Sequence, residues 1–309
     1  MRPDRAGDEQ RVLSSTKIRG RDQDMDSAMD TSTDAAAALP TLKPQERVAA
    51  HLSDAFELRR QGRHQAASEH LEAALAEARA TPYEIEFRTR VDVAITLAEL
   101  YLASEEVAKA RAMLREEADF AERIFQIVQM SGTPDQKRAA AGGRVQLRDR
   151  ARQVEILGSA APEISVKTWI NNDATTLRDL RGRVVLLEFW ATWCKPCQEM
   201  FPKLRKLDEE YRSRGLEVIA LTRHYMAYRA TAASQDEELE LMRKVVRDES
   251  LAFRVGVAEG ERTQELYGAT GLPMLALIDR KGVVRYAHFG GGEDPKFNET
   301  LIKCLDETA

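Results

Sequence analysis

Two cysteines three positions apart are the residues of this sequence best suited to chemistry. In Trp193-Cys194-Lys195-Pro196-Cys197 the two sulfurs lie close enough to bond if Cys194 begins a helix and Cys197 belongs to its first turn. Unpaired amide N–H groups and the helix dipole stabilise an anion there, and thiols in such motifs have a lowered pKa. We therefore predict that Cys194 is the attacking thiolate and Cys197 the less exposed resolving thiol.

The residues around the dithiol fit the same interpretation. Lys195 supplies a nearby cation that favours a thiolate, and Pro196 suits a first helical turn, where its missing N–H is not needed. Trp193 is expected to pack beside the sulfurs and shape the substrate surface, to which Lys195 and Pro196 are also expected to belong. The alternative is half of a zinc site, but such a site needs four ligands, and besides Cys304 only scattered histidines are present. We predict no metal and no cofactor other than the redox-active disulfide Cys194–Cys197.

Strands alternate with helices after residue 153, whereas the chain before it is helical. Runs rich in β-branched residues alternate there with helical stretches, and a hairpin turned at Asp279-Arg280-Lys281-Gly282 closes the series. This pattern predicts an α/β domain, 153–309, with a mixed central sheet flanked by helices. The predicted strands are 184–190, 216–221, 274–278 and 283–288, and the predicted helices are 197–214, 236–249, 262–267 and 295–306.

The first half of the chain predicts a tail followed by an all-α domain. Residues 1–42 lack aromatic side chains and cannot bury enough apolar surface to order themselves, so we expect a disordered tail. Residues 43–152 carry apolar stripes at helical spacing, which predict two helical hairpins broken at Gly62 and at 104–106. Gly142-Gly143 is expected to loosen the chain before the domain boundary.

The first hairpin resembles a tetratricopeptide repeat at its turn and second helix, in Gly62-Arg63-His64-Gln65-Ala66-Ala67 and the Leu and Ala residues that follow. The next hairpin follows about 43 residues later, against a period of about 34 in that family. A generic antiparallel bundle of Ala and Leu helices is the other interpretation.

Several motifs in order resemble the thioredoxin fold, and in particular its TlpA/ResA-like branch of thiol–disulfide oxidoreductases. They are Phe189-Trp190-Ala191-Thr192-Trp193-Cys194-Lys195-Pro196-Cys197, the lead-in Leu180-Arg181-Gly182-Arg183-Val184-Val185-Leu186, and Tyr267-Gly268-Ala269-Thr270-Gly271-Leu272-Pro273. The resemblance covers about residues 155 to 309. It implies a thioredoxin fold and thiol–disulfide exchange.

The resemblance also assigns roles to residues outside the dithiol. It implies that Pro273 is a cis-proline facing the cysteines, and that the backbone of Leu272 binds a substrate polypeptide as an added strand. Glu188 stands where thioredoxins carry a buried acid. A carboxyl group buried there would have a raised pKa and would accept the proton of Cys197. An exposed glutamate at the end of a strand is the alternative.

Charge and composition restrict the partners. The 309 residues carry a net charge of −5 with acids and bases interspersed, so we expect neither a nucleic acid nor a membrane span. The expected partners are protein thiol or disulfide substrates, an upstream thiol electron donor, and a protein that binds the helical domain. No continuous apolar signal segment occurs early in the chain, which predicts a cytoplasmic protein. An extracytoplasmic location stays open if Met25 or Met29 makes the start uncertain.

Two other functions compete with thiol–disulfide exchange. Peroxiredoxin-like peroxidases share the fold but carry Pro-x-x-x-Thr-x-x-Cys, and Leu187 and Ala191 occupy the matching positions here. An interaction protein of the tetratricopeptide type could instead use the thioredoxin fold as a scaffold. The intact cysteines, Pro273 and Glu188 favour an active dithiol over both alternatives.

Overall fold

The computed structural model describes residues 42–225, 234–290 and 295–307. Residues from Pro44 onward form one compact unit. The predicted disordered tail lies outside the described residues except for Leu42. No helix in the described ranges has the length and hydrophobicity that a bilayer span requires.

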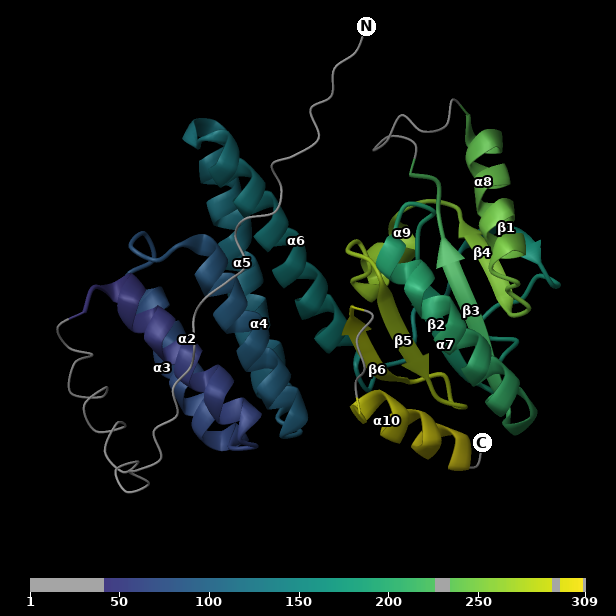
Figure 1. Ribbon diagram of the computed structural model, residues 1–309, viewed down its shortest axis with the longest axis horizontal. Coiled ribbons are helices and arrows are strands. Elements are labelled where there is room, and N and C mark those ends of the chain that lie inside the picture. The colour runs from purple at the N-terminus through teal and green to yellow at the C-terminus, as the bar shows by residue number, and fades with distance from the viewer. Residues whose placement is uncertain (1–41, 226–233, 291–294, 308–309) are drawn as a thin grey trace, which may run out of the picture. The chain divides into compact units, whose positions relative to one another are not determined.

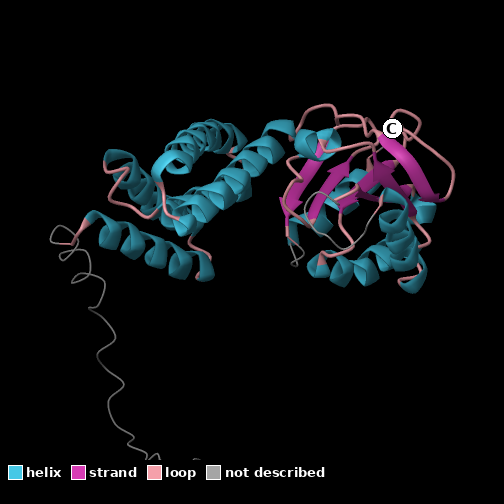
Figure 2. Ribbon diagram, turned by 90° about the horizontal axis from the view of Figure 1, so that it is seen from above, coloured by secondary structure: helices cyan, strands magenta, loops and turns pink. Residues whose placement is uncertain are grey.

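The first part of the described chain consists of helices only (Figure 2). Both predicted hairpins are present, and the first one turns at Gly62, whose φ is +75°. Small side chains such as Ala67, Ala74 and Ala78 are fully buried, which lets the helices approach closely. The helices are α2 (Pro44–Arg60), α3 (His64–Ala80), α4 (Phe87–Ala103), α5 (Val107–Ser131) and α6 (Pro134–Ile156).

The expected loosening at Gly142-Gly143 is wrong, because α6 runs through both glycines without a break. Thr133 starts the helix with a capping box, in which its side chain accepts a hydrogen bond from the Gln136 amide. A Cβ atom at Gly143 would lie 2.5 Å from a ring carbon of Phe87. The glycine therefore allows α4 and α6 to cross closely. The predicted boundary at residue 153 lies three residues before the end of α6.

A six-stranded mixed sheet follows, in the order β1-β4-β3-β2-β5-β6. β2, β3 and β4 are parallel, while β1, β5 and β6 run antiparallel to their neighbours. The strands are β1 (Val166–Asn171), β2 (Val184–Phe189), β3 (Leu216–Thr222), β4 (Arg254–Ala258), β5 (Met274–Ile278) and β6 (Val284–Phe289). A mixed sheet flanked by helices was predicted (Figure 1), and the four predicted strand ranges match β2, β3, β5 and β6.

The helices of this part are α7 (Lys195–Tyr211), α8 (Gln235–Asp248), α9 (Arg262–Tyr267) and α10 (Pro295–Asp306), with a short 3₁₀ turn at Arg212–Arg214. Their bounds were expected within two residues, except that α7 ends three residues before the end of the predicted helix 197–214. Asp279 forms the β5–β6 turn, since its Oδ1 accepts hydrogen bonds from the amides of Lys281 and Val283.

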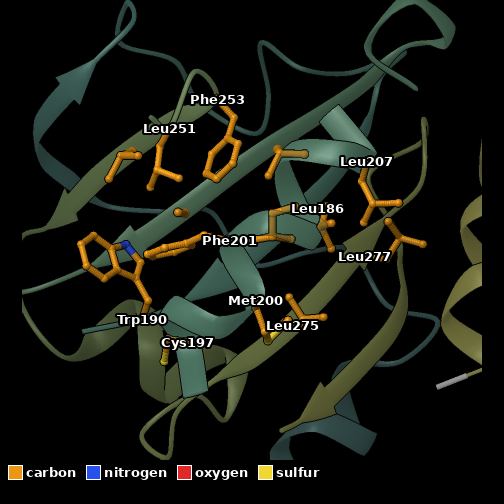
Figure 3. Close-up of a cluster of buried hydrophobic side chains, with 14 of the residues drawn as sticks. Leu186, Trp190, Cys197, Met200, Phe201, Leu207, Leu251, Phe253, Leu275 and Leu277 are labelled. Carbon is orange, nitrogen blue, oxygen red and sulfur yellow. The ribbon is translucent and has the colours of Figure 1, made fainter. Parts of the chain in front are cut away.

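Alternation along β2 divides its side chains between two cores. Leu186 and Trp190 pack with side chains of α7, α8 and α10, whereas Leu187 and Phe189 pack with α9 and the end of α6. Figure 3 shows Cys197 at the edge of the first cluster, near Trp190 and Met200. The dithiol is therefore attached to the core on the α7 face of the sheet.

Candidate active site

The start of α7 positions the two cysteines. Cys194 is the N-cap residue, and Lys195 and Pro196 fill the first two helical positions. The Cys194 carbonyl accepts hydrogen bonds from the amides of Cys197 and Gln198 at 3.1 and 3.2 Å. Cys194 and Cys197 are joined by a disulfide. The chain thus holds the pair at a helix N-terminus, as the spacing predicts.

The two sulfurs differ in their surroundings. Cys194 keeps 4% of its surface exposed and Cys197 keeps none. The sulfur of Cys197 lies 4.0 Å from the carbonyl oxygen of Phe189, the last residue of β2. Of the two cysteines, only Cys194 keeps any exposed surface, and its role as the attacking thiol stays a prediction.

Lys195 contributes less than its position in the sequence suggests. Its side chain is 85% exposed, and its ammonium lies 3.9 Å from the carboxylate of Glu199. Water and this carboxylate screen its charge. The N-terminus of α7 is the other expected source of thiolate stabilisation.

Trp193 forms the exposed side of the site. It is 39% exposed and packs edge-on against Tyr225, with ring centroids 5.4 Å apart. The Tyr225 hydroxyl accepts a hydrogen bond from Gln264 at 2.6 Å, and burial raises the pKa of Tyr225 to about 12. The Tyr225 side chain is therefore uncharged near neutral pH, is held by Gln264 and packs against Trp193. Trp190, in contrast, is fully buried against Phe201, as expected of a core residue.

Glu188 is the penultimate residue of β2, but it is not exposed. It is fully buried, and its neighbours in the sheet are Ala220 and Leu275. Neither carboxyl oxygen has a hydrogen-bond partner in the described part of the chain. Burial raises the pKa of Glu188 well above its ordinary value. A carboxyl group in this position holds a proton at neutral pH far more readily than an exposed glutamate does.

The raised pKa of Glu188 predicts a pH-dependent stability of the oxidised protein. Below about pH 4.5, the ordinary value, the folded and the unfolded chain both hold the proton. As the pH rises toward the raised pKa, only the unfolded chain ionises. The free energy of unfolding then falls by about 1.4 kcal/mol per pH unit. Glu188→Gln removes this fall, so the variant should gain stability relative to the wild type as the pH rises from 4.5 to 8.5.

Urea denaturation of the oxidised proteins across that pH range measures the difference. Glu199→Gln is the matched control, since Glu199 lies on the surface of α7 with 65% of its side chain exposed. Its profile should follow that of the wild type. Parallel profiles for the wild type and Glu188→Gln would show that Glu188 has an ordinary pKa.

The peptide bond between Leu272 and Pro273 is cis, which is the geometry that the family resemblance implied. Pro273 directly precedes β5, the antiparallel neighbour of β2. The carbonyl of Pro273 accepts a hydrogen bond from the Gly290 amide. Leu272 is half-buried, and the β5 ladder begins only at Met274. Pro273 thus belongs to a loop at the end of the strand beside β2.

Cys304, the third cysteine, lies on α10 and is buried. Burial raises the pKa of its thiol to about 11. It therefore stays protonated and unreactive near neutral pH. Within the described ranges, no three His, Cys, Asp or Glu side chains gather in a way that would hold a metal ion.

Comparison with known proteins places this site in a family. Residues 156–301 match the redoxin family. The thiol-disulfide oxidoreductase ResA of Bacillus thuringiensis (strain Al Hakam) is 34% identical over 128 residues, which are 41% of this chain and 66% of that protein. The thioredoxin-like protein YneN of Bacillus subtilis (strain 168) is 32% identical over 133 residues, which are 43% of this chain and 71% of that protein. The chain belongs to the ResA-like redoxin family.

The redoxin match covers the sheet, α7 to α9 and the first part of α10, whereas α2–α5 and all of α6 except Ile156 lie outside it. The chain spans slightly less than two thirds of the first ResA protein. Among solved structures, a thiol-disulfide isomerase from Corynebacterium glutamicum is 27% identical, covers 48% of this chain and 98% of its own, and superposes with a TM-score of 0.42. The redoxin part carries every residue of the predicted site.

Proposed function

We propose that this redoxin is a thiol–disulfide oxidoreductase that reduces disulfides in protein substrates. The observation that carries the proposal is the Cys194–Cys197 disulfide at the N-terminus of α7. Two sulfurs bonded across the first turn of a helix can pass reversibly between a dithiol and a disulfide. The relatives named as thiol-disulfide oxidoreductases support the same chemistry.

The first step is attack by Cys194. In the reduced protein its thiolate displaces one sulfur of a client disulfide and forms a mixed disulfide with the other. The displaced client sulfur leaves as a thiolate and takes a proton from water. The amide groups of the first turn of α7 stabilise the Cys194 thiolate before attack.

The second step releases the client. Cys197 gives its proton to the Glu188 carboxylate, and the new thiolate attacks the Cys194 sulfur. This restores the Cys194–Cys197 disulfide and frees the second client thiolate. The client gains two electrons and the dithiol loses them. Burial raises the pKa of Glu188 well above its ordinary value, which makes its carboxylate a better proton acceptor.

The client chain is expected to pair with the backbone of Leu272. This residue lies between the hydrogen-bonded positions of Gly271 and Pro273, and no described residue bonds to its own amide or carbonyl. An extended segment could therefore add to the sheet at this point. Trp193, exposed beside Cys194, would supply apolar contact on the other side of the sulfurs. Leu272 and Trp193 would bind the substrate, whereas Pro196 shapes the turn.

Two features favour reduction over oxidation. A strongly stabilised thiolate makes an oxidant, because it stabilises the reduced form. Here the ammonium of Lys195 is screened by solvent and Glu199. The buried Glu188 disfavours a second negative charge nearby when it is ionised. An upstream thiol donor would then restore the dithiol after each turnover.

Redox equilibration with glutathione or dithiothreitol buffers tests the direction. We expect a potential closer to about −270 mV than to about −120 mV, the values of a reductant and a strong oxidant of this fold. The reduced protein should also reduce insulin disulfides, and Cys304→Ser should match the wild type. A potential near −120 mV, or failure to reduce insulin, would overturn the proposal. That the helical region binds a partner protein stays a prediction.

A further inference from the structure

We infer that Asp149, on α6, is a positioning residue for the loop that presents Leu272 to a client, an inference that rests on the proposed function. Its Oδ2 accepts three hydrogen bonds from this loop. The donors are the Thr270 amide at 3.1 Å, the Thr270 hydroxyl at 2.5 Å and the Gly271 amide at 3.0 Å. Two successive backbone amides are thus held by one carboxylate, directly before Leu272.

The carboxylate is itself held in place. Asp149 is 5% exposed, and its Oδ1 accepts hydrogen bonds from Arg148 at 3.1 and 3.2 Å. Arg148 also donates to the Thr270 hydroxyl at 2.7 Å. Hydrogen bonds to a carboxylate are stronger than those between neutral groups. These hydrogen bonds restrain the backbone at Thr270 and Gly271.

The loop packs closely against α6 at Gly268. Gly268 has a φ of +63°, and a Cβ atom there would lie 2.3 Å from the backbone oxygen of Asp149. Only glycine allows this approach. The Gln153 amide group donates to the Gly268 carbonyl at 2.7 Å, and Arg152 donates to the Leu266 carbonyl at 2.9 Å. Helix α6 therefore binds the segment from Leu266 to Gly271 at several points.

Fixing the loop before binding lowers the ordering cost when a client strand pairs with Leu272. Asp149 does not contact the sulfurs in any described interaction, so the attack of Cys194 on a small disulfide should not depend on it. A protein client needs both the thiolate and the ordered Leu272 backbone. Asp149 should thus affect the KM for protein disulfides and leave the chemistry of Cys194 unchanged.

Asp149→Ala in the full chain tests this role, with Gln153→Ala as the matched control. Gln153 is equally buried at the same contact but bonds to Gly268, outside the Thr270–Gly271 pair. For Asp149→Ala we expect the KM for insulin to rise about tenfold with little change in kcat, and the rate with 5,5′-dithiobis(2-nitrobenzoate) to stay the same. The Thr270 and Gly271 amides should exchange hydrogen about tenfold faster, the effect of losing a charged hydrogen bond. Gln153→Ala should change both readouts less, because its hydrogen bond holds Gly268 and its loss leaves the Thr270 and Gly271 amides bonded to Asp149.

Thr270→Val covers the case in which Asp149→Ala does not fold. It keeps the shape of the side chain and removes one of the three hydrogen bonds to Asp149, together with the one from Arg148. It should raise the KM for insulin by a smaller factor. An unchanged KM and unchanged amide exchange in both variants, or equal effects in Gln153→Ala, would overturn the inference. If the wild type itself does not reduce insulin, the proposed function fails, while the amide exchange still reports whether Asp149 holds the loop.

Discussion

Cys197→Ser, reduced and mixed with a protein disulfide, should accumulate a stable mixed disulfide through Cys194. The wild type resolves this intermediate because Cys197 lies one helical turn away and can form the Cys194–Cys197 bond. The serine hydroxyl cannot displace sulfur at neutral pH. Non-reducing electrophoresis and mass spectrometry of the adduct measure the trapped species. Turnover of insulin should fall at least about 100-fold, since the second step is lost.

Cys194→Ser should prevent formation of the mixed disulfide, and Cys304→Ser is the control for loss of a cysteine outside the dithiol. Without Cys194 the buried Cys197 should form no adduct, and insulin reduction should disappear. Cys304 lies buried on α10 with a raised thiol pKa, so its replacement should leave trapping and turnover unchanged. Insulin reduction that survives in Cys194→Ser would contradict the assignment of the attacking thiol.

Glu188→Gln should slow the resolution of the mixed disulfide by roughly 100-fold, a typical effect of losing a positioned proton acceptor. Glutamine has nearly the same shape but cannot take the proton of Cys197. The first attack by Cys194 should change little, because the helix N-terminus stabilises that thiolate. Stopped-flow measurement of Trp193 fluorescence with a disulfide substrate separates the two steps.

The pH dependence of resolution distinguishes a proton acceptor from a packing residue. In the wild type, the resolution rate should rise with pH as Glu188 loses its proton. Measurements from about pH 6 to 9 cover the range in which a raised carboxyl pKa or a thiol titrates. In Glu188→Gln this rise should be absent, while Glu199→Gln should behave as the wild type. Equal resolution rates in the wild type and Glu188→Gln across this range would mean that the proton passes directly to water.

Local sequence signals explain how much of the fold could be predicted. The helix start at Cys194, the turn at 279–282 and the helix bounds at 262–267 and 295–306 all depend on neighbours in the chain. Capping groups, proline and glycine act over a few residues, so their effects are visible in the sequence. The cis bond before Pro273 followed from a family resemblance, since most X–Pro bonds are trans.

The features that were missed depend on contacts between distant residues. β4 was not expected, because Gly256 weakens its strand pattern. A Cβ atom at Gly256 would lie about 3.0 to 3.2 Å from Val166, Trp169 and Leu221. In the same way, the unbroken course of α6 depends on the contact of Gly143 with Phe87. Glycines serve close packing at these points, whereas in sequence they resemble breaks.

In the candidate site, too, local features could be predicted from the sequence and contacts between distant residues could not. The sequence placed both cysteines, but left open whether Glu188 is buried, since a strand position alone does not reveal what covers it. Asp149 was not identified at all, because it lies in a charged stretch of α6 that resembles a solvated helix face. Only the contact with Thr270 and Gly271, more than 120 residues later, distinguishes it from its neighbours.

Redox mapping of all three cysteines after a single turnover tests the central claim most directly. The reduced wild type is mixed with one equivalent of a disulfide substrate, quenched in acid, alkylated and digested for mass spectrometry. The account predicts one Cys194–Cys197 disulfide for each client disulfide reduced, with Cys304 still a thiol. A reduced client with Cys194 and Cys197 both still thiols, or with Cys304 consumed, would contradict it.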